Sequence, residues 1–516
     1  MLRATLAIAL TALVGIPAGA QEGAAHVHWM QRDRAWYTQA GVVQANGDAV
    51  PDVVVAAGDR DAAYQGCLAP PGYPGFLLDQ VVDTVLIGAA KLAVLDGRTG
   101  DPLWEMAWRP GGDAIDPPTV ERYHLVSGVF TDDMDGDGQN DLVVLRTVRP
   151  SDGSDQTHHI TSYDPGTGAV EWDVTRTSPG DELSILGLAP IEVFGEPGAM
   201  LALLTVKITI EGGSFDITIE GKNELVQLEP GEAPQTVVEL PDDLGLAYPV
   251  PYGEGYRFIS FPLRISGPPP MASVDARAMD LTLDPDTGDP VFTEAWSRPE
   301  AGGSPAQVTG GDDPALVIGR IVGTTNTSNV VAMDLDTGAD RWISPVDAGP
   351  TGGTFITADV NGDGTGDVIA SPAFGDDPTG LFTGGFFAEV HALDGRTGQP
   401  LWTATDRLSK FRAWSLGLVD IDGTGGPELV GSMTHQDGFP LCSAAADDTG
   451  SVSVWDLDTG TQRCRLATDR WAADLVGAEM NGLPGDEIVA PTVGGNVYAF
   501  TNAEPGCGLL ATNPLE

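Results

Sequence analysis

Carboxylate side chains recur at a regular spacing within one short stretch of the chain. Residues 133–141 read DMDGDGQND, which places carboxylates at the first, third, fifth and ninth positions and glycines at the fourth and sixth. A hard cation such as Ca²⁺ takes roughly six to eight oxygen ligands, and a tight acidic loop with glycines at its sharp bends can supply most of them. The stretch therefore has the signature of a metal site.

The same frame recurs elsewhere in the chain. It returns at 359–367 as DVNGDGTGD and, with altered chemistry, at 420–428 as DIDGTGGPE. Reduced versions occupy 44–52, QANGDAVPD, and 479–487, EMNGLPGDE, where too many ligands are missing to predict a metal. Repeated copies of one loop indicate a repeat architecture, in which each copy belongs to one structural unit.

A second motif alternates with these acidic loops. The sequence LDGRTGDPLW at 95–104 has relatives with the same spacing around the Thr-Gly pair, and the copies end at Trp104, Trp172, Phe292, Trp342, Trp402 and Cys464. Weaker versions lie at 228–235 and 500–506. Asp and Thr side chains that bond nearby backbone groups, followed by a glycine that tolerates positive φ, favour a tight turn between two strands. Each copy, called a TG turn below, predicts a β-hairpin whose final aromatic residue packs against the neighbouring unit.

The alternation of acidic loops and TG turns divides the chain into eight units of roughly 60 residues each. Each unit supplies about four short strands, because one strand flanks each side of the acidic loop and one flanks each side of the TG turn. Four-stranded sheets repeated radially form a β-propeller. We therefore predict an all-β protein, a single eight-bladed propeller of antiparallel blades over residues 21–516. A seven-bladed ring is the alternative, because the unit around 251–258 carries only a faint pattern.

Long connections are expected between the second and third strands of three units. They cover 58–86, 371–388 and 433–450. Because they leave equivalent positions, they should crowd one face, and repeat proteins often bind partners where such insertions gather. A further hairpin at 208–221 alternates in polarity and is expected to project from its blade.

The net charge and the N-terminal residues indicate which partners and which compartment the protein has. Its 74 acidic and 26 basic residues give a formal net charge of -48, and such a surface repels nucleic acid and anionic membranes. Residues 1–20 combine Arg3, an apolar run over 6–16 and a small-residue end, which is the pattern of a cleaved secretory signal peptide. No later segment is apolar for long enough to span a bilayer. We predict a monomer that is secreted or periplasmic.

Four cysteines in an exported chain predict two disulfides, for which three pairings are possible. The repeat frame favours Cys442 with Cys464, because both fall in one unit. It favours Cys67 with Cys507, because the first and last units are neighbours in a closed ring, which this bridge would pin shut. The alternative is that one or more of the four are free and buried.

Two family resemblances together cover nearly all of residues 21–516. The acidic loops resemble the FG-GAP or VCBS repeats of integrin-type propellers, in which calcium lies in the turn between the first two strands of a blade. The TG turns are similar to the tryptophan-docking repeats of quinoprotein-like (PQQ-repeat) propellers, which typically have eight blades. Both motifs identify a fold more specifically than an activity.

The first resemblance implies two calcium sites and a weaker third. The implied ligands are Asp133, Asp135, Asp137, Asp141 and the backbone carbonyl of Gln139 in the first loop; Asp359, Asn361, Asp363, Asp367 and the carbonyl of Thr365 in the second; and Asp420, Asp422 and Glu428 in the third. An EF-hand is the rival interpretation, but it needs a longer loop that ends in Glu and a helix on each side. The other alternative is a structural turn that binds no metal.

The residues favour a binding scaffold over an enzyme. Quinoprotein dehydrogenases generally carry adjacent cysteines on their cofactor, and this chain has neither adjacent cysteines nor a CxxCH haem motif, so neither PQQ nor haem is expected. A calcium-containing propeller lyase, resembling rhamnogalacturonan lyases, would need a base near the axis. The candidates, which show no metal-triad spacing, are His26, His28, His158, His159 and His391. We predict a non-catalytic, calcium-stabilised scaffold for a protein or carbohydrate partner, with the lyase as the alternative.

Overall fold

The computed structural model describes residues 27–501 except for a set of gaps. These gaps are 33–34, 60–89, 109–121, 132, 135–137, 139, 151–153, 181–182, 212–213, 230–231, 242–243, 245–246, 254, 267–270, 285, 288, 310–312, 323–326, 348–353, 372–387, 407–412, 414, 436–448 and 493–494. The signal peptide predicted at 1–20 lies outside the described residues. Within them, no helix has the length and hydrophobicity that a membrane crossing requires.

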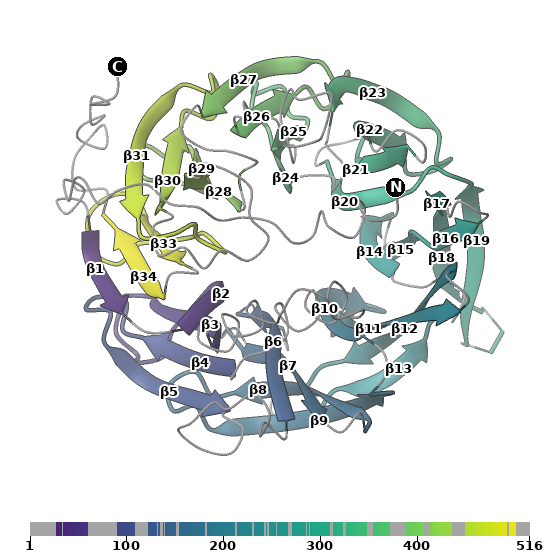
Figure 1. Ribbon diagram of the computed structural model, residues 1–516, viewed down its shortest axis with the longest axis horizontal. Helices are drawn as coiled ribbons and strands as arrows, with labels where there is room; N and C mark the ends of the chain where they lie inside the picture. The colour runs from purple at the N-terminus through teal and green to yellow at the C-terminus, as the bar shows by residue number, and fades with distance from the viewer. Residues whose placement is uncertain are drawn as a thin grey trace.

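The strands form eight four-stranded antiparallel sheets, which stand as blades in a ring around a central axis (Figure 1). The first half of the ring contains blade 1, β2 (Ala35–Val43), β3 (Asp52–Asp59), β4 (Ala90–Leu95) and β5 (Pro102–Trp108); blade 2, β6 (Arg122–Phe130), β7 (Leu142–Pro150), β8 (Gln156–Tyr163) and β9 (Val170–Ser178); blade 3, β10 (Leu183–Val193), β11 (Glu196–Glu211), β12 (Ser214–Gln227) and β13 (Gln235–Glu239); and blade 4, β14 (Ala247–Tyr252), β15 (Gly255–Ser260), β18 (Ala276–Leu283) and β19 (Pro290–Arg298). The second half contains blade 5, β20 (Gly303–Val308), β21 (Ala315–Val322), β22 (Thr327–Asp334) and β23 (Asp340–Asp347); blade 6, β24 (Thr354–Ala358), β25 (Asp367–Ser371), β26 (Ala388–Leu393) and β27 (Pro400–Asp406); blade 7, β28 (Leu416–Val419), β29 (Glu428–His435), β30 (Thr449–Trp455) and β31 (Gln462–Thr468); and blade 8, β32 (Val476–Ala478), β33 (Glu487–Pro491), β34 (Asn496–Phe500) and β1 (Val27–Arg32). The prediction of an eight-bladed propeller is confirmed.

The ring closes through its first strand. β1 pairs antiparallel with β34, with Met30 opposite Tyr498, and so becomes the outer strand of blade 8. Figure 1 shows this strand beside the last strands of the chain. The sequence suggested instead that a final TG turn near 500–506 would lead into the last strand. A strand from the other end of the chain fills that place.

Blades 3 and 4 carry no acidic loop. In blade 3 the turn between β10 and β11 is closed by Phe194 and Gly195, both at positive φ, between the paired residues Val193 and Glu196. Blade 4 has a similarly short turn between Tyr252 and Gly255. This is why the pattern was faint near 251–258, although the blade is complete. Blade 4 also has an additional hairpin, β16 (Leu263–Ser266) with β17 (Met271–Val274).

The hairpin predicted at 208–221 belongs to blade 3. Pairing between β11 and β12 continues beyond the other strands of the sheet to Glu211 opposite Ser214. β13 pairs with β12 only from Glu224 onward. The far part of the hairpin is therefore a two-stranded extension of the blade.

The hydrophobic core lies between adjacent blades. The second strands are covered on both faces, and β25 and β33 are buried along their whole length. Outer strands such as β5 alternate between exposed and half-buried positions, because only one face packs inward. Val53 and Val55 of blade 1 pack with Val489 and Val497 of blade 8, so the core also runs across the closure.

Tryptophans on the outer strands of blades 1, 4, 5 and 6 join each of these blades to the next. The indole Nε1 of Trp104 donates to the carbonyl of Pro165 at 2.7 Å, and that of Trp402 donates to the carbonyl of Leu457 at 2.9 Å. The ring lies directly over the TG-turn glycine: a Cβ at Gly168, where φ is +68°, would be 2.9 Å from the indole of Trp104. Only glycine accommodates both this close approach and the positive φ.

Blade 4 departs from the predicted slot. Trp296, not Phe292, donates its Nε1 to the carbonyl of Leu335 at 2.7 Å and packs over Gly338. A register shift between Ala278 and Met279 moves the docking position along β19. Phe292 instead meets Phe258 edge to face, with ring centroids 6.3 Å apart.

The long connections and three of the four cysteines lie mainly outside the described residues. The strands that flank the connections end on the face opposite the acidic loops, because consecutive antiparallel strands alternate their turns between the two faces. Cys464 is buried and disulfide-bonded. Cys67, Cys442 and Cys507 are not described, so both pairings stay predictions.

Candidate metal centre

The five acidic loops share one hydrogen bond between their two ends. In each, the carboxylate at the ninth position accepts a hydrogen bond from the backbone N–H of the second position at 2.7–3.0 Å. These ninth residues are Asp52, Asp141, Asp367, Glu428 and Glu487, and all but Asp141 are fully buried. The repeated spacing in the sequence is therefore accompanied by a repeated hydrogen bond in the structure.

The ninth carboxylate also ties the acidic loop to the TG turn of its own blade. The second oxygen of Asp52 accepts from the N–H of Gly97 at 3.1 Å, and that of Asp367 accepts from the N–H of Gly395 at 2.7 Å. Burial raises the pKa of Asp367, although the backbone N–H groups around it act in the opposite direction. Loop and turn thus form one hydrogen-bonded unit on one face of the ring.

In the three fuller loops, at 133–141, 359–367 and 420–428, the carboxylate at the first position accepts a backbone hydrogen bond from within its own loop. Asp133, Asp359 and Asp420 accept from the N–H of the sixth residue, Gly138, Gly364 and Gly425, at 2.9, 2.9 and 3.0 Å. Those glycines all have positive φ. In the first loop Asp133 and Asp141 are thereby placed, while Asp135, Asp137 and Gln139 lie outside the described residues.

The second loop is complete in the structure. Asp363 accepts from the N–H of Thr365 at 2.8 Å, a bond that lowers the pKa of Asp363, and it contacts Arg396 at 3.2 Å. Asn361 accepts from the N–H of Asp363 at 2.9 Å. The oxygen donors at the first, third, fifth and ninth positions suit a hard cation. Within the described residues these carboxylates are not drawn into one close group, so an ion would have to gather them.

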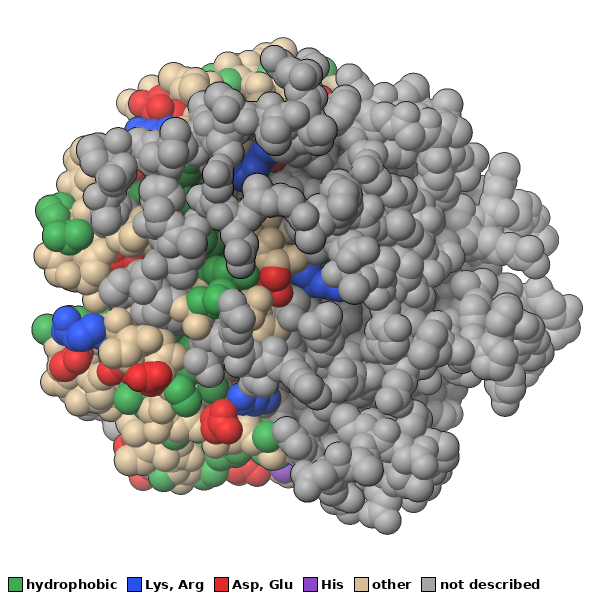
Figure 2. Space-filling view, turned by 60° about the vertical axis from the view of Figure 1, so that its left-hand side comes forward, with side chains coloured by type: hydrophobic (Ala, Val, Ile, Leu, Met, Phe, Trp, Pro, Cys, Tyr) green, Lys and Arg blue, Asp and Glu red, His purple; other side chains and the backbone are tan. Residues whose placement is uncertain are grey.

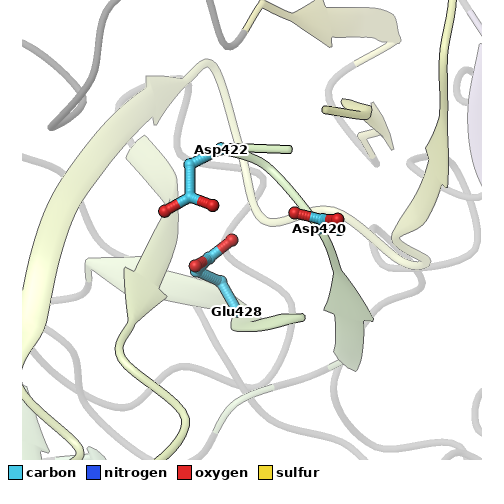
Figure 3. A group of neighbouring side chains, drawn as sticks. All are labelled: Asp420, Asp422 and Glu428. Atoms are coloured by element: carbon cyan, nitrogen blue, oxygen red, sulfur yellow. The ribbon is translucent and has the colours of Figure 1, made fainter. Parts of the chain in front are cut away.

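The third loop does bring its carboxylates together. One oxygen from each of Asp420, Asp422 and Glu428 lies within 4.8 Å of the others. Figure 3 shows Asp422 and Glu428 turned toward each other, with Asp420 at their side. Burial raises the pKa of Glu428, whereas hydrogen bonding to Thr424 and then to Arg463 lowers the pKa of Asp422. This donor set fits a cation.

A guanidinium already contacts that group. Arg463 Nη1 is 2.8 Å from Asp422 Oδ2 and 2.7 Å from Glu428 Oε1. Sequence analysis did not identify Arg463 as part of the site. The sequence did contain one signal. Arg463 directly precedes Cys464, which occupies the position of a docking tryptophan, just as Arg341 directly precedes Trp342.

The two reduced loops hold an amide at the third position, as the second loop does with Asn361, whereas the first and third loops hold a carboxylate there. Asn46 Nδ2 donates to Asp52 Oδ1 and to Asp96 Oδ2, both at 3.2 Å. Asn481 Nδ2 donates to Glu487 and, at 3.1 Å, to Thr501. An uncharged donor therefore links the acidic loop to the outer part of the blade in both cases.

The histidines whose side chains are described are held inside their own blades. His158 is fully buried between Thr147 and Ser178, with a hydroxyl 2.8 Å from each ring nitrogen. His159 pairs with Asp173 at 3.1 Å. His391 lies 3.0 Å from Thr403. The structure does not bring these three together at one point.

A family model described as outer membrane protein assembly factor BamB matches residues 276–462. The match runs from the start of β18 to the start of β31 and includes the TG turns of blades 4 to 7. It covers less than half of the chain. Together with the ring of eight blades, it supports a propeller that contains PQQ-type repeats over the matched residues.

The similar solved structures include rhamnogalacturonan lyases. Exotype rhamnogalacturonan lyase YesX aligns with a TM-score of 0.42 and 14% identity over 91% of this chain and 90% of that chain. Rhamnogalacturonan lyase PL11 of Bacillus licheniformis has a TM-score of 0.39 and 14% identity over 92% and 91% of the two chains. Rhamnogalacturonan lyase YesW has a TM-score of 0.37 and 14% identity over 92% and 91%. Similarity at this level carries no functional argument. No curated protein matches the chain.

Proposed function

We propose that this protein is a non-catalytic, calcium-braced propeller that presents a rigid face to a protein or carbohydrate partner outside the cytoplasm. The observation that carries the proposal is the hydrogen-bonded unit of acidic loop and TG turn. The carboxylates of Asp52 and Asp367 each accept N–H groups from both parts. Carboxylates in these loops are thus used to hold the framework, and recognition is left to the surfaces around it.

The surface charge supports a specific rather than a purely electrostatic partner. Figure 2 shows Asp or Glu side chains next to Lys or Arg side chains at several places on the described part of one side. Lys91 pairs with Glu105 at 2.9 Å and Arg277 pairs with Glu294 at 3.0 Å. Paired charges attract a polyion less than a uniform patch does. We place the partner's contacts in the long connections, which start from equivalent positions on one face.

Calcium removal should destabilise the protein. We propose calcium sites in the first two loops. An ion that binds only the folded state stabilises that state by about 2.7 kcal/mol when free calcium is 100 times Kd. We expect EDTA to lower the melting temperature and added Ca²⁺ to restore it, as followed by circular dichroism. Asp363→Asn should reduce this shift, because it removes a ligand charge from the second loop.

The matched control is Asp289→Asn, which removes an exposed carboxylate from a TG turn. It should leave the calcium-dependent shift unchanged. An unchanged melting temperature in EDTA would remove calcium from the proposal, including the sites at Asp133–Asp141 and Asp359–Asp367.

The scaffold claim is tested by assays for turnover. We expect no product from acidic polysaccharides, including rhamnogalacturonan, or from alcohols supplied with a quinone, while a partner is captured by binding assays. The three described histidines, each committed to neighbours in its own blade, support this expectation. Formation of unsaturated oligosaccharides in the presence of Ca²⁺ would replace the scaffold with the lyase alternative.

A further inference from the structure

Arg463 reaches across its blade into the third acidic loop. Its Nη1 is shared between Asp422 Oδ2 at 2.8 Å and Glu428 Oε1 at 2.7 Å, and its Nη2 is 3.2 Å from Asp456 Oδ1 in the TG turn. Asp422 and Glu428 are two of the three residues whose oxygens gather there. A guanidinium at these distances supplies both the positive charge and the directed hydrogen bonds that clustered carboxylates require.

Blade 5 repeats this arrangement independently. Arg341 directly precedes the docking Trp342, as Arg463 precedes Cys464. Arg341 Nη2 is 2.7 Å from Asp313 Oδ1, between the first two strands, and 2.9 Å from Asp334 Oδ2 in the TG turn. The same side chain at the same repeat position therefore connects the same two parts of the blade.

The second acidic loop has no arginine at the position equivalent to Arg463. Blade 6 has Leu401 at the equivalent position, 38% exposed, so no guanidinium reaches the loop from there. Its loop keeps oxygen donors at the first, third, fifth and ninth positions. The third loop has lost one of these, because Thr424 replaces the carboxylate at the fifth position. Arg396 of the blade 6 TG turn contacts one carboxylate of the second loop, Asp363, at 3.2 Å. Arg463, by contrast, bridges two carboxylates of the incomplete third loop.

We infer that the guanidinium of Arg463 is the resident cation of the third acidic loop and fills the place that a divalent ion would take there. The loop is then braced without a metal, and its carboxylates hold the TG turn through Arg463. Asp420 Oδ1, which is buried and has no hydrogen-bond partner among the described residues, remains as an oxygen donor if the guanidinium is removed. The inference assigns this loop an occupant different from calcium and does not depend on calcium in the first two loops.

The test counts bound ions. Calcium per chain is measured by calorimetry, and terbium luminescence gives a second count, for the wild type and for Arg463→Leu, which copies the residue found in blade 6. We expect the variant to bind one more ion than the wild type. Arg463→Lys retains the positive charge and should add none. Arg341→Leu is the matched control, since its loop at 310–318 has Asp312 and Asp313 but no further carboxylate.

A second variant, which keeps Arg463, tests the inference if Arg463→Leu does not fold. Asp422→Asn should leave the number of bound ions unchanged and should lower the melting temperature equally in Ca²⁺ and in EDTA. Loss of one bound ion in Asp422→Asn, or an equal ion count in Arg463→Leu and the wild type, would overturn the inference. A wild-type count of zero would instead remove calcium from the proposed function and leave the comparison between variants valid.

Discussion

Replacing Trp342 with alanine should lower the free energy of unfolding by about 4 kcal/mol. The side chain is 7% exposed, packs over Gly398 in the TG turn of blade 6, and donates Nε1 to the carbonyl of Gly395 at 2.9 Å. Its removal leaves a cavity between two blades and an unpaired carbonyl. Urea unfolding followed by intrinsic fluorescence and circular dichroism measures the difference.

Trp342→Phe is the control for that experiment. It keeps most of the aromatic volume and loses the indole hydrogen bond, so the expected loss is smaller, about 1 kcal/mol. If Trp342→Ala and Trp342→Phe were equally stable, docking onto the TG turn would not hold the blades together.

Acid should destabilise the protein through His158. The ring is 0% exposed, and burial lowers the pKa of His158 from 6.5 to about 4, with a smaller contribution from His159. Between these values the unfolded chain binds a proton that the folded chain does not, so stability is greatest above pH about 6.5 and falls as the pH drops toward 4. The shift corresponds to about 3 kcal/mol. Below pH 4 this group adds no further loss.

The measurement compares urea unfolding at pH 7.5 and 4.5. Many carboxylates also titrate in this range, so the difference between variants isolates the histidine. His158→Gln should lose less stability on acidification than the wild type, by up to that amount. His159→Gln changes a neighbour that pairs with Asp173 and removes only the smaller contribution to the pKa of His158, so it should keep most of the wild-type dependence. An identical acid loss in His158→Gln and the wild type would contradict the assignment.

The features that sequence predicted correctly are those set by short-range constraints. An acidic loop closes on its own ninth residue, as Asp367 shows with Val360, and a TG turn closes on its own Asp and Thr. Both patterns lie within about ten residues, so spacing alone reveals them, and it favoured eight blades over seven. Blades 3 and 4 remained faint because their two-residue turns carry no such side chains.

The features that sequence missed depend on partners far away in the chain. Trp296 docks because a bulge between Ala278 and Met279 shifts the register, which spacing along β19 does not show. Arg463 lies 41 residues from Asp422, and only the fold brings them together. For the acidic loops, the residue types indicated oxygen donors, but the distances between these donors depend on side-chain geometry and, in the third loop, on the neighbouring Arg463.

The pairing of β1 with β34 makes assembly order a property of the ring. β1 precedes the other described strands along the chain and shares a sheet with β32, β33 and β34, so blade 8 cannot be completed until these later strands of the ring have been synthesised. The entropic cost of closing a chain loop rises only slowly with loop length. Contacts between residues so far apart in the sequence nevertheless form slowly. Seven blades can pack against one another while blade 8 still lacks its outer strand. Until β1 pairs with β34, blade 8 has an unpaired strand edge to which another extended segment can bind. A fusion partner attached next to Val27 would hinder β1, the strand that closes the ring.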